Sequence, residues 1–375
     1  MTCLKRLLQR YDPLKPKKIL IVASADSPLL RARALFPEYA GHQIVWFSES
    51  VQAPECNAKT YHARKHRRLG FVWRLWSMLL FWLALMKERP DIVHVHWAIF
   101  PALLLKKRWS NLIVSPMGSD IFINGYMGLR TIISRKVIHK ATIITSKSEF
   151  MDQRINELMR QKTLIKRITW GIAPDIFRVD ENRLDARKRL NLDIDSLVFF
   201  SPRANRPLYR IDQIIKAFAD YLQKGGEGYL LVAEMYGSAE TRAHLNSQIK
   251  SSRIRERVKF LGSLSTHQMH ACYAAADAVV SYASTDGMPQ TLYEAMAAGC
   301  FPVFTDLPQY RSLLEHGVNS FLCGDAANRR LSDGMAYAAR AVAAGWDPTP
   351  NRELVARIAS RDKEVSRMNR IYDLI

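Results

Sequence analysis

The chain has 375 residues, too many for one small core, and at roughly 100 to 200 residues per domain we expect two domains. A composition of 48% hydrophobic, 10% aromatic and 24% charged residues, with 17 Gly and 16 Pro, excludes collagen-like, low-complexity and wholly disordered chains. The five cysteines include no C-x-x-C pair, so neither a disulfide framework nor a zinc site is indicated. A reducing cytoplasm is favoured. We expect no signal peptide and no membrane-spanning segment.

The net charge of +20 is concentrated in the first half of the chain. Residues 1–170 hold 29 Lys and Arg against 11 Asp and Glu, whereas residues 171–375 hold 26 against 24. This asymmetry predicts an anionic partner for the first half, either a nucleic acid or an anionic membrane surface. Charge alone does not choose between the two.

Short apolar runs alternate with segments long enough for helices along the whole chain. In the first half the predicted strands are 18–23, 43–47, 92–97, 112–115 and 142–145, with a helix-compatible segment at 29–39. The alternation resumes after residues 170–174, with predicted strands at 197–201, 229–233, 258–261, 278–282 and 301–305. Strands that alternate with helices predict two doubly wound parallel α/β domains, joined near 171–195. Residues 352–375 are predicted to form a polar helix that crosses the domain junction.

The segment 64–89 departs from this alternation. Basic residues at 64, 65, 67 and 68 precede a sixteen-residue apolar run, 71–86, that holds three Trp and two Phe and ends at Lys87 and Arg89. The run is shorter than the roughly 20 apolar residues that a membrane span needs. It is either a helix buried under the sheet or a helix lying in a membrane interface, where cations meet anionic headgroups and indoles sit at the boundary. The net charge of its domain favours the interface.

Residues 257–324 carry an ordered series of motifs: a strand ending in F-L-G, a helix ending in A-D, a strand, the loop D-G-M-P-Q, the helix L-Y-E-A-M-A-A-G, another strand and E-H-G-V-N-S. This series resembles the C-terminal half of the retaining glycosyltransferases of family 4, the glycosyl transferases group 1. The resemblance extends less sharply over about residues 90–325, including P-D-I-V-H-V-H at 90–96, M-G-S-D at 117–120 and residues 203–218.

The resemblance implies an α/β GT-B fold, in which two doubly wound Rossmann-like domains face each other across a cleft. The N-terminal domain, 1–172, is expected to face the acceptor and the membrane. Residues 173–355 are expected to bind the nucleotide sugar, and the helix 356–375 to pack back toward the N-terminal domain.

The loop before the helix at 291–298 is the first candidate site. The turn-rich residues Asp286, Gly287, Met288, Pro289 and Gln290 precede a helix whose first N–H groups and dipole attract an anion such as a diphosphate. Asp286 and Glu294 stand eight residues apart, and they match the acidic pair of the family with its first Glu shortened to Asp. The resemblance implies that Asp286 contacts donor-sugar hydroxyls and that Glu294 binds the nucleotide ribose.

The second candidate site follows the first strand of the second domain. Arg203 matches a family arginine that neutralises the donor phosphates, and an arginine fork suits phosphate. The lysine that completes the family clamp is replaced by Tyr209, which leaves Arg206 and Arg210 as candidate cations.

Two features of the N-terminal domain complete the analysis. His94 and His96 share one face of a strand, as metal ligands can, but no third ligand is evident, so structural or site-lining histidines are expected. At Met117-Gly-Ser-Asp120 the family commonly has His-Gly-x-Asp; Met117 replaces the histidine, so no catalytic histidine is expected there. Gly118 and Asp120 remain candidate site residues, although Asp120 could instead cap a helix.

The sequence therefore predicts a cytoplasmic, peripherally membrane-associated retaining glycosyltransferase that needs neither a metal nor another cofactor. Its predicted partners are a nucleotide sugar, a lipid-linked or glycan acceptor, and an anionic membrane surface contacted by residues 64–89. No nucleic-acid partner is expected. Two alternatives remain open: a GT-B nucleotide-sugar epimerase or hydrolase, because a fold does not fix a reaction, and a basic nucleic-acid-binding protein.

Overall fold

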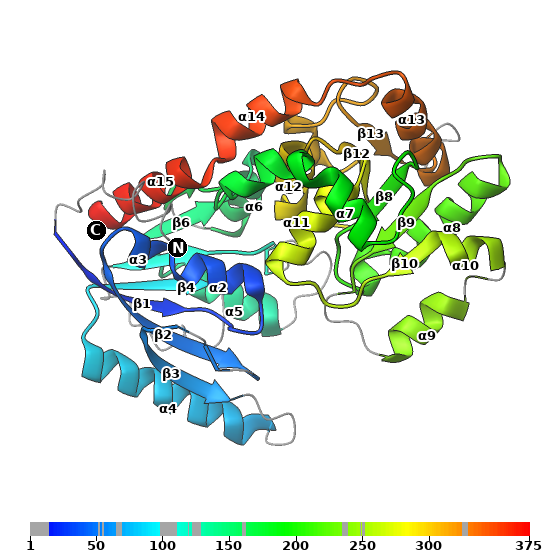
Figure 1. Ribbon diagram of the computed structural model, residues 1–375. Helices are drawn as coiled ribbons and strands as arrows, with labels where there is room; N and C mark the ends of the chain where they lie inside the picture. The colour runs from blue at the N-terminus through cyan, green and yellow to red at the C-terminus, as the bar shows by residue number, and fades with distance from the viewer. Residues whose placement is uncertain are drawn as a thin grey trace. The chain divides into compact units, whose positions relative to one another are not determined.

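The computed structural model divides the chain into two compact units, each an α/β layer structure (Figure 1). The first unit comprises Met1–Gly171 and Arg361–Ile375, and the second comprises Ile172–Ser360. The structure describes residues 15–375 apart from 52, 55, 65–69, 98–110, 119, 122–128, 160–162, 235–238, 248, 250, 251 and 325–328. Of the basic residues at 64–68, only Arg64 therefore lies inside the described residues.

The first unit is built on a parallel sheet of order β3-β2-β1-β4-β5-β6-β7. Its strands β1, β4, β5 and β6 are almost wholly buried, as expected when helices cover both faces of a sheet. Strands β3 and β7 were not predicted, because they lie at the two edges and their residues are more polar and more exposed. The strands are β1 Lys18–Val22, β2 Gln43–Ser50, β3 Lys59–Arg64, β4 Ile92–His96, β5 Leu112–Ser115, β6 Ile143–Ser146 and β7 Leu164–Arg167.

The helices of the first unit include one from the far end of the chain. The segment predicted at 29–39 forms two short helices, because Leu35 interrupts it. Helix α15 packs against α3, which brings the C-terminal residues into this unit. The helices are α2 Pro28–Ala34, α3 Phe36–Tyr39, α4 Gly70–Glu88, α5 Leu129–Ile138, α6 Glu149–Leu158 and α15 Arg361–Asp373.

The second unit repeats the same winding with a parallel sheet of order β10-β9-β8-β11-β12-β13. Its strands are β8 Val198–Ser201, β9 Tyr229–Val232, β10 Val258–Phe260, β11 Ala278–Ser281, β12 Phe301–Thr305 and β13 Phe321–Cys323. Its helices are η3 Pro174–Asn182, α7 Arg183–Arg189, η4 Pro207–Tyr209, α8 Ile211–Gln223, α9 Ala239–Ser247, α10 Ser252–Arg257, α11 Thr266–Ala275, α12 Gln290–Ala298, η5 Pro308–Ser312, α13 Leu331–Ala343 and α14 Thr349–Ala359.

The single C-terminal helix predicted at 352–375 was wrong, because two helices occupy that segment. Helix α14 ends at Ala359, and Ser360 adopts an extended conformation before α15 begins at Arg361. The break coincides with the boundary between the two units. An extended residue at that point lets the chain leave one unit and enter the other.

Helix α4 has one buried and one exposed apolar face. Ser77, Phe81, Ala84, Leu85 and Glu88 are buried, at the three- and four-residue spacing of one helix face, and the helix packs on β2 and β3 (Figure 1). The exposed face carries large apolar side chains at Phe71, Val72, Leu75, Trp76, Leu79, Trp82, Leu83 and Met86. The interpretation as a helix packed on the sheet is therefore correct for one face, and the interfacial interpretation stays a prediction for the other.

By length and composition, α4 is also a candidate membrane span, and it is the one such helix among the residues that the structure describes. This outcome differs from the sequence-based expectation, because the helix extends beyond the apolar run at both ends. Its buried face nevertheless packs on the sheet: the rings of Phe81 and Phe47 lie 5.1 Å apart, and the Ser77 hydroxyl donates to Glu49. Helix α4 therefore lies along the surface of the first unit, with one face packed on β2 and β3.

Candidate functional site

The candidate site of the second unit lies at the carboxyl ends of β8 and β11. These strands are neighbours, but the chain continues from β8 to one side of the sheet and from β11 to the other. Such a topological switch point is where open α/β sheets bind ligands. Arg203 follows β8 and Asp286 follows β11, so the switch point brings together two residues that are far apart in the sequence.

Arg203 is the buried cation of this site. Its Nη2 donates to Asp286 Oδ2 at 2.5 Å, its Nη1 donates to Thr291 Oγ1 at 2.9 Å, and its guanidinium lies 4.0 Å from the ring centroid of Tyr209. Burial alone would lower the pKa of Arg203, but the charge of Asp286 outweighs it and raises that pKa above its ordinary value. The side chain is a fixed cation held in a rigid position.

Asp286 is oriented by its own loop as well as by Arg203. Its Oδ1 accepts from the backbone N–H of Gly287 at 2.7 Å, and the amide of the buried Gln309 donates to its carbonyl oxygen. The phenol of Tyr310 is buried near this carboxylate; burial, reinforced by the negative charge of Asp286, raises the pKa of Tyr310 well above its ordinary value. Asp286 therefore presents a charge in one defined position.

Helix α12 begins beside this pair. Pro289 is its N-cap residue and supplies no side-chain cap, so the first turn directs backbone N–H groups toward the loop. Met288 is buried with φ of 68°, an uncommon conformation for a bulky side chain and one that often marks functional loops. The helix ends at Ala298, and Gly299, with a φ of 79°, forms its left-handed C-cap.

Glu294 is half-buried on α12, one turn beyond Gln290 and Thr291. Its Oε2 accepts a hydrogen bond of 2.9 Å from the hydroxyl of Tyr273 on α11. Burial of Tyr273, together with the charge of Glu294, raises the pKa of that phenol well above its ordinary value, so it remains a hydrogen-bond donor. Tyr273 therefore fixes the position of the Glu294 carboxylate.

Arg206 and Arg210 are less closely tied to the site than Arg203. Arg206 is exposed, whereas Arg210 lies in the left-handed region, with φ of 49°, and its guanidinium is 5.5 Å from the ring centroid of Tyr282. The sequence placed Tyr209 at the position of the missing lysine, but it did not reveal that Tyr209 stacks on Arg203. Thr291 and Gln309 were missed too; their positions at helix or loop starts after β11 and β12 were the available signal.

The predicted N-terminal residues lie in the other unit. Asp120 Oδ1 accepts from the backbone N–H groups of Met117 and Gly118, each at 2.9 Å. Asp120 thus holds its own loop, in which Gly118 has a φ of 114° that favours glycine. Ser119 lies outside the described residues.

His94 and His96 are buried and stacked, with ring centroids 4.2 Å apart. His94 bonds to Tyr372 and Ser115 through its two ring nitrogens, each at 2.7 Å. Within the described part of the chain, no group of three or more His, Cys, Asp or Glu side chains is arranged to hold a metal ion.

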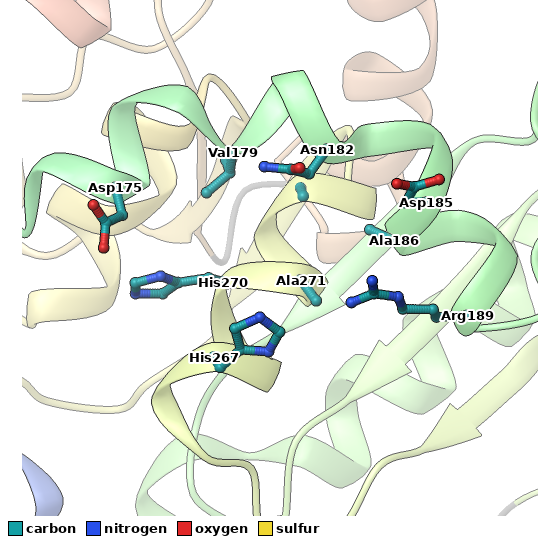
Figure 2. Close-up of a pocket in the computed structure, with 10 residues that line it drawn as sticks. Asp175, Val179, Asn182, Asp185, Ala186, Arg189, His267, His270 and Ala271 are labelled. Atoms are coloured by element: carbon teal, nitrogen blue, oxygen red, sulfur yellow. The ribbon is translucent and has the colours of Figure 1, made fainter.

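A separate pocket of about 280 Å³ lies between η3, α7 and α11 (Figure 2). His267 and His270, one helical turn apart on α11, line one wall, and Asp175, Asp185 and Arg189 line the other. It shares no residue with the Arg203–Asp286 site. Sequence analysis did not single out its residues, because they come from two distant segments with no recognisable motif.

Comparison with solved structures identifies the class of fold. The chain is similar to a sucrose-phosphate synthase from Thermosynechococcus elongatus, with a TM-score of 0.78 and 15% identity, covering 96% of this chain and 98% of that one. It is also similar to HepE from Anabaena, solved in complex with UDP-glucose, with a TM-score of 0.76 and 14% identity, covering 96% of this chain and 100% of that one. WaaG, a glycosyltransferase involved in lipopolysaccharide biosynthesis, is similar with a TM-score of 0.77 and 13% identity, covering 94% of this chain and 99% of that one. The fold is GT-B.

Residues 182–340 match the family model described as glycosyl transferases group 1. This match lies within the second unit, and the resemblance expected from the motifs in 257–324 is confirmed. No curated protein sequence matches the chain.

Proposed function

We propose that this chain transfers a sugar from a nucleoside diphosphate donor to an acceptor hydroxyl, with retention of the anomeric configuration. The observation that carries the proposal is the rigid arrangement of Arg203, Asp286 and the uncapped start of α12 at the switch point of the second sheet. A leaving diphosphate gains negative charge as the glycosidic bond breaks. A fixed cation and N–H groups directed at that charge stabilise the transition state without needing to reorganise.

The remaining side chains take separate roles in this proposal. Asp286, anchored by Arg203 and Gly287, orients donor-sugar hydroxyls, and Glu294, anchored by Tyr273, accepts from the nucleotide ribose. Gly287, Met288, Pro289 and Gln290 place the loop backbone beside the diphosphate, with Arg206 and Arg210 as further cations. The proposed reaction uses no metal and no other cofactor. HepE, which shares the fold, has been solved with UDP-glucose, and this supports a nucleotide sugar as donor.

Binding and turnover of nucleotide sugars test this function. A screen of nucleotide sugars by thermal shift should find a donor that stabilises the chain, by about 2.7 kcal/mol at 100 times its dissociation constant. Arg203→Met should weaken donor binding at least tenfold. Turnover should require an added acceptor. Release of nucleotide without an acceptor, or epimerisation of the sugar, would instead favour the hydrolase or epimerase alternative.

We also propose that the enzyme works at the cytoplasmic face of a membrane, on a lipid-linked or glycan acceptor, with the exposed face of α4 in the interface. Phe71, Trp76 and Trp82 are among its apolar side chains, and the flanking Lys87 and Arg89 are exposed cations. Each basic residue near an anionic surface contributes about 1 kcal/mol, a contribution that salt screens. WaaG, another chain with this fold, is a glycosyltransferase of lipopolysaccharide biosynthesis.

Sedimentation with vesicles tests whether the exposed face of α4 binds a membrane while the buried face stabilises the fold. The wild type should bind anionic vesicles strongly and neutral vesicles weakly, and its binding to anionic vesicles should weaken as salt rises. Replacing Phe71, Trp76 and Trp82 by Ser should abolish binding and leave the melting temperature nearly unchanged. The matched control is Phe81→Ser, on the buried face, which should lower the melting temperature instead. If the wild type does not bind anionic vesicles, the proposal that α4 lies in a membrane interface is wrong.

A further inference from the structure

The first sheet has a switch point of its own, between β1 and β4. The chain continues from β1 to β2 on one side, and from β4 to β5 on the other. His96 is the last residue of β4, Met117 follows β5, and Trp170 follows β7, while Arg33 lies on α2, which follows β1. Four elements of the first unit thus bring these side chains to the carboxyl edge of the sheet, where open α/β sheets bind ligands.

Arg33 is a buried cation that has no carboxylate partner in the described part of the chain. Only 1% of it is exposed, and Nη1 donates to the sulfur of Met117 at 2.9 Å, a weak acceptor. Nε and Nη2 are buried and have no hydrogen-bond partner among the described residues. The guanidinium lies 4.9 Å from the ring centroid of Trp170. A buried charge that is not paired strongly destabilises a fold, so this arrangement calls for an anion.

Arg187 is equally buried, and its guanidinium shows by contrast how the protein can match the charge and the N–H groups of a buried arginine. Arg187 donates to Ala275 O at 3.1 Å, to Ser196 O at 2.8 Å and to Asp277 Oδ2 at 2.8 Å. Its charge and its N–H groups are therefore matched by the protein. Those of Arg33 are not, although both side chains are equally buried.

His96 presents a second set of unmatched groups beside Arg33. Both of its ring nitrogens are buried and lack a partner among the described residues, while its ring lies 5.0 Å from that of Trp170. Burial first, and then the charges of His94 and Arg33, lower the pKa of His96 well below its ordinary value, so the imidazole is neutral. A neutral imidazole offers one donor and one acceptor, which together suit a hydroxyl group.

We propose that Arg33 and His96 form a binding site for a ligand that carries an anionic group, a carboxylate or a phosphate, next to a hydroxyl. The anion would pair with the free N–H groups of the Arg33 guanidinium, and the hydroxyl with the ring of His96. Trp170 packs against both side chains and fixes their positions. The excess of 29 basic over 11 acidic residues in 1–170 attracts such a ligand. If the proposed function holds, the ligand is the acceptor, and the acceptor is an acidic or a phosphorylated sugar.

The experiment measures anion binding to the full chain by thermal shift, with glucuronate and inorganic phosphate as separate probes. At least one of them should raise the melting temperature of the wild type, and Arg33→Met should weaken the binding of that probe at least tenfold. Without any anion, Arg33→Met should melt at or above the wild-type temperature, because it removes an unpaired buried charge. Arg187→Met is the matched control: it should melt lower and bind the anion as the wild type does.

The outcomes separate this site from the donor site. Arg203→Met should lose UDP binding and keep the response to the anion, whereas Arg33→Met should do the reverse. A response to glucuronate alone identifies a carboxylate ligand, and a response to phosphate alone identifies a phosphorylated one. A wild type that responds to neither probe overturns the proposal, whatever the variants do.

A second variant covers the case in which Arg33→Met does not fold. His96→Phe keeps a ring against Trp170 and removes both nitrogens, and it should also weaken anion binding; unchanged affinity would overturn the proposal. If the wild type responds to the anion but does not bind UDP, the proposed donor is rejected, and the proposal of an anion site at Arg33 and His96 is still supported.

Discussion

Each of the two switch points of this chain has a buried arginine, and the two arginines differ in the partners that the protein gives their guanidinium groups. In the second unit, Arg203 is paired with Asp286 and Thr291 and stacked on Tyr209. In the first unit, the guanidinium of Arg33 donates to the thioether of Met117 and lies over the indole of Trp170, and its Nε and Nη2 have no hydrogen-bond partner among the described residues. The comparison teaches that the guanidinium of Arg203 is matched by protein groups, whereas that of Arg33 keeps N–H groups that have no partner among the described residues and that we propose a ligand matches. Preorganisation suits a site that stabilises a developing charge; an unmatched cation suits selection of an anionic partner.

The largest expected effect is a loss of stability on removing the carboxylate at the centre of a cluster of ion pairs in the second unit. Asp277 pairs with Arg183 and Arg187 and accepts from the backbone N–H of Val198 at 2.7 Å. Asp277→Ala should therefore lower the free energy of unfolding by about 3–5 kcal/mol, as removal of one partner of a buried pair does. Urea unfolding measures it. Asp306→Ala is the control, because Arg311 and Arg329 are more exposed, and it should lose at most about 1 kcal/mol.

Glu294→Gln sharpens the comparison within the donor site. The substitution keeps the shape of the side chain and its helix propensity but removes its charge. If the carboxylate accepts ribose hydroxyls, nucleoside diphosphate binding should weaken by roughly 1.5–3 kcal/mol, the usual contribution of hydrogen bonds to charged groups. Calorimetric titration measures it, with Glu240→Gln on the exposed start of α9 as the control. Equal affinities for wild type and Glu294→Gln would remove Glu294 from the ribose site.

The first unit should lose stability in mild acid. Burial, and then the charge of Arg33, lowers the pKa of His94 to about 3, and the pKa of His96 is also lowered. Since the unfolded histidines titrate near 6.5, the unfolded state binds more protons below that pH. The free energy of unfolding is therefore highest above pH 6.5 and falls as the pH is lowered toward 3; for His94 the loss is about 2 kcal/mol at pH 5, and His96 adds to it.

Unfolding at pH 8 and at pH 5 tests this acid sensitivity. His96→Phe should reduce the difference in the free energy of unfolding between the two pH values. Tyr372, Ser115 and Trp170 surround the pair but do not titrate in this range, so they should not contribute. A variant with the same pH dependence as the wild type would mean that the two histidines are not buried in their neutral form.

The sequence predicted the regular parts of both sheets better than their edges. The buried central strands were found because continuous apolar runs mark them. Strands β3 and β7 were missed because their residues are half exposed, and the break at Ser360 was missed because no Gly or Pro marks it. The faces of α4 could not be assigned, since its run is apolar on all sides and only packing on Phe47 distinguishes Phe81 from Trp82.

The same limit applies to the two sites. Arg203, Asp286 and Glu294 could be proposed because they stand in a motif with fixed spacing. Tyr209, Thr291, Gln309 and Tyr310 join them only through tertiary contacts. Arg33 stands in no motif, and its significance lies in the partners that it lacks after folding. No pattern along a sequence reveals an absence of that kind.

The smallest expected effect concerns Asp120, which the sequence offered as either a catalytic residue or a cap. Its Oδ1 accepts from two backbone N–H groups, and an asparagine oxygen at the same position can accept from both. Asp120→Asn should therefore keep turnover within about threefold of the wild type and unfold within about 1 kcal/mol of it, whereas Asp120→Ala should lose about 0.5–2 kcal/mol of stability, as removal of a capping side chain does. If Asn instead lowers turnover as far as Ala while the melting temperature holds, the charge of Asp120 acts on the substrate, and the loop contact is secondary.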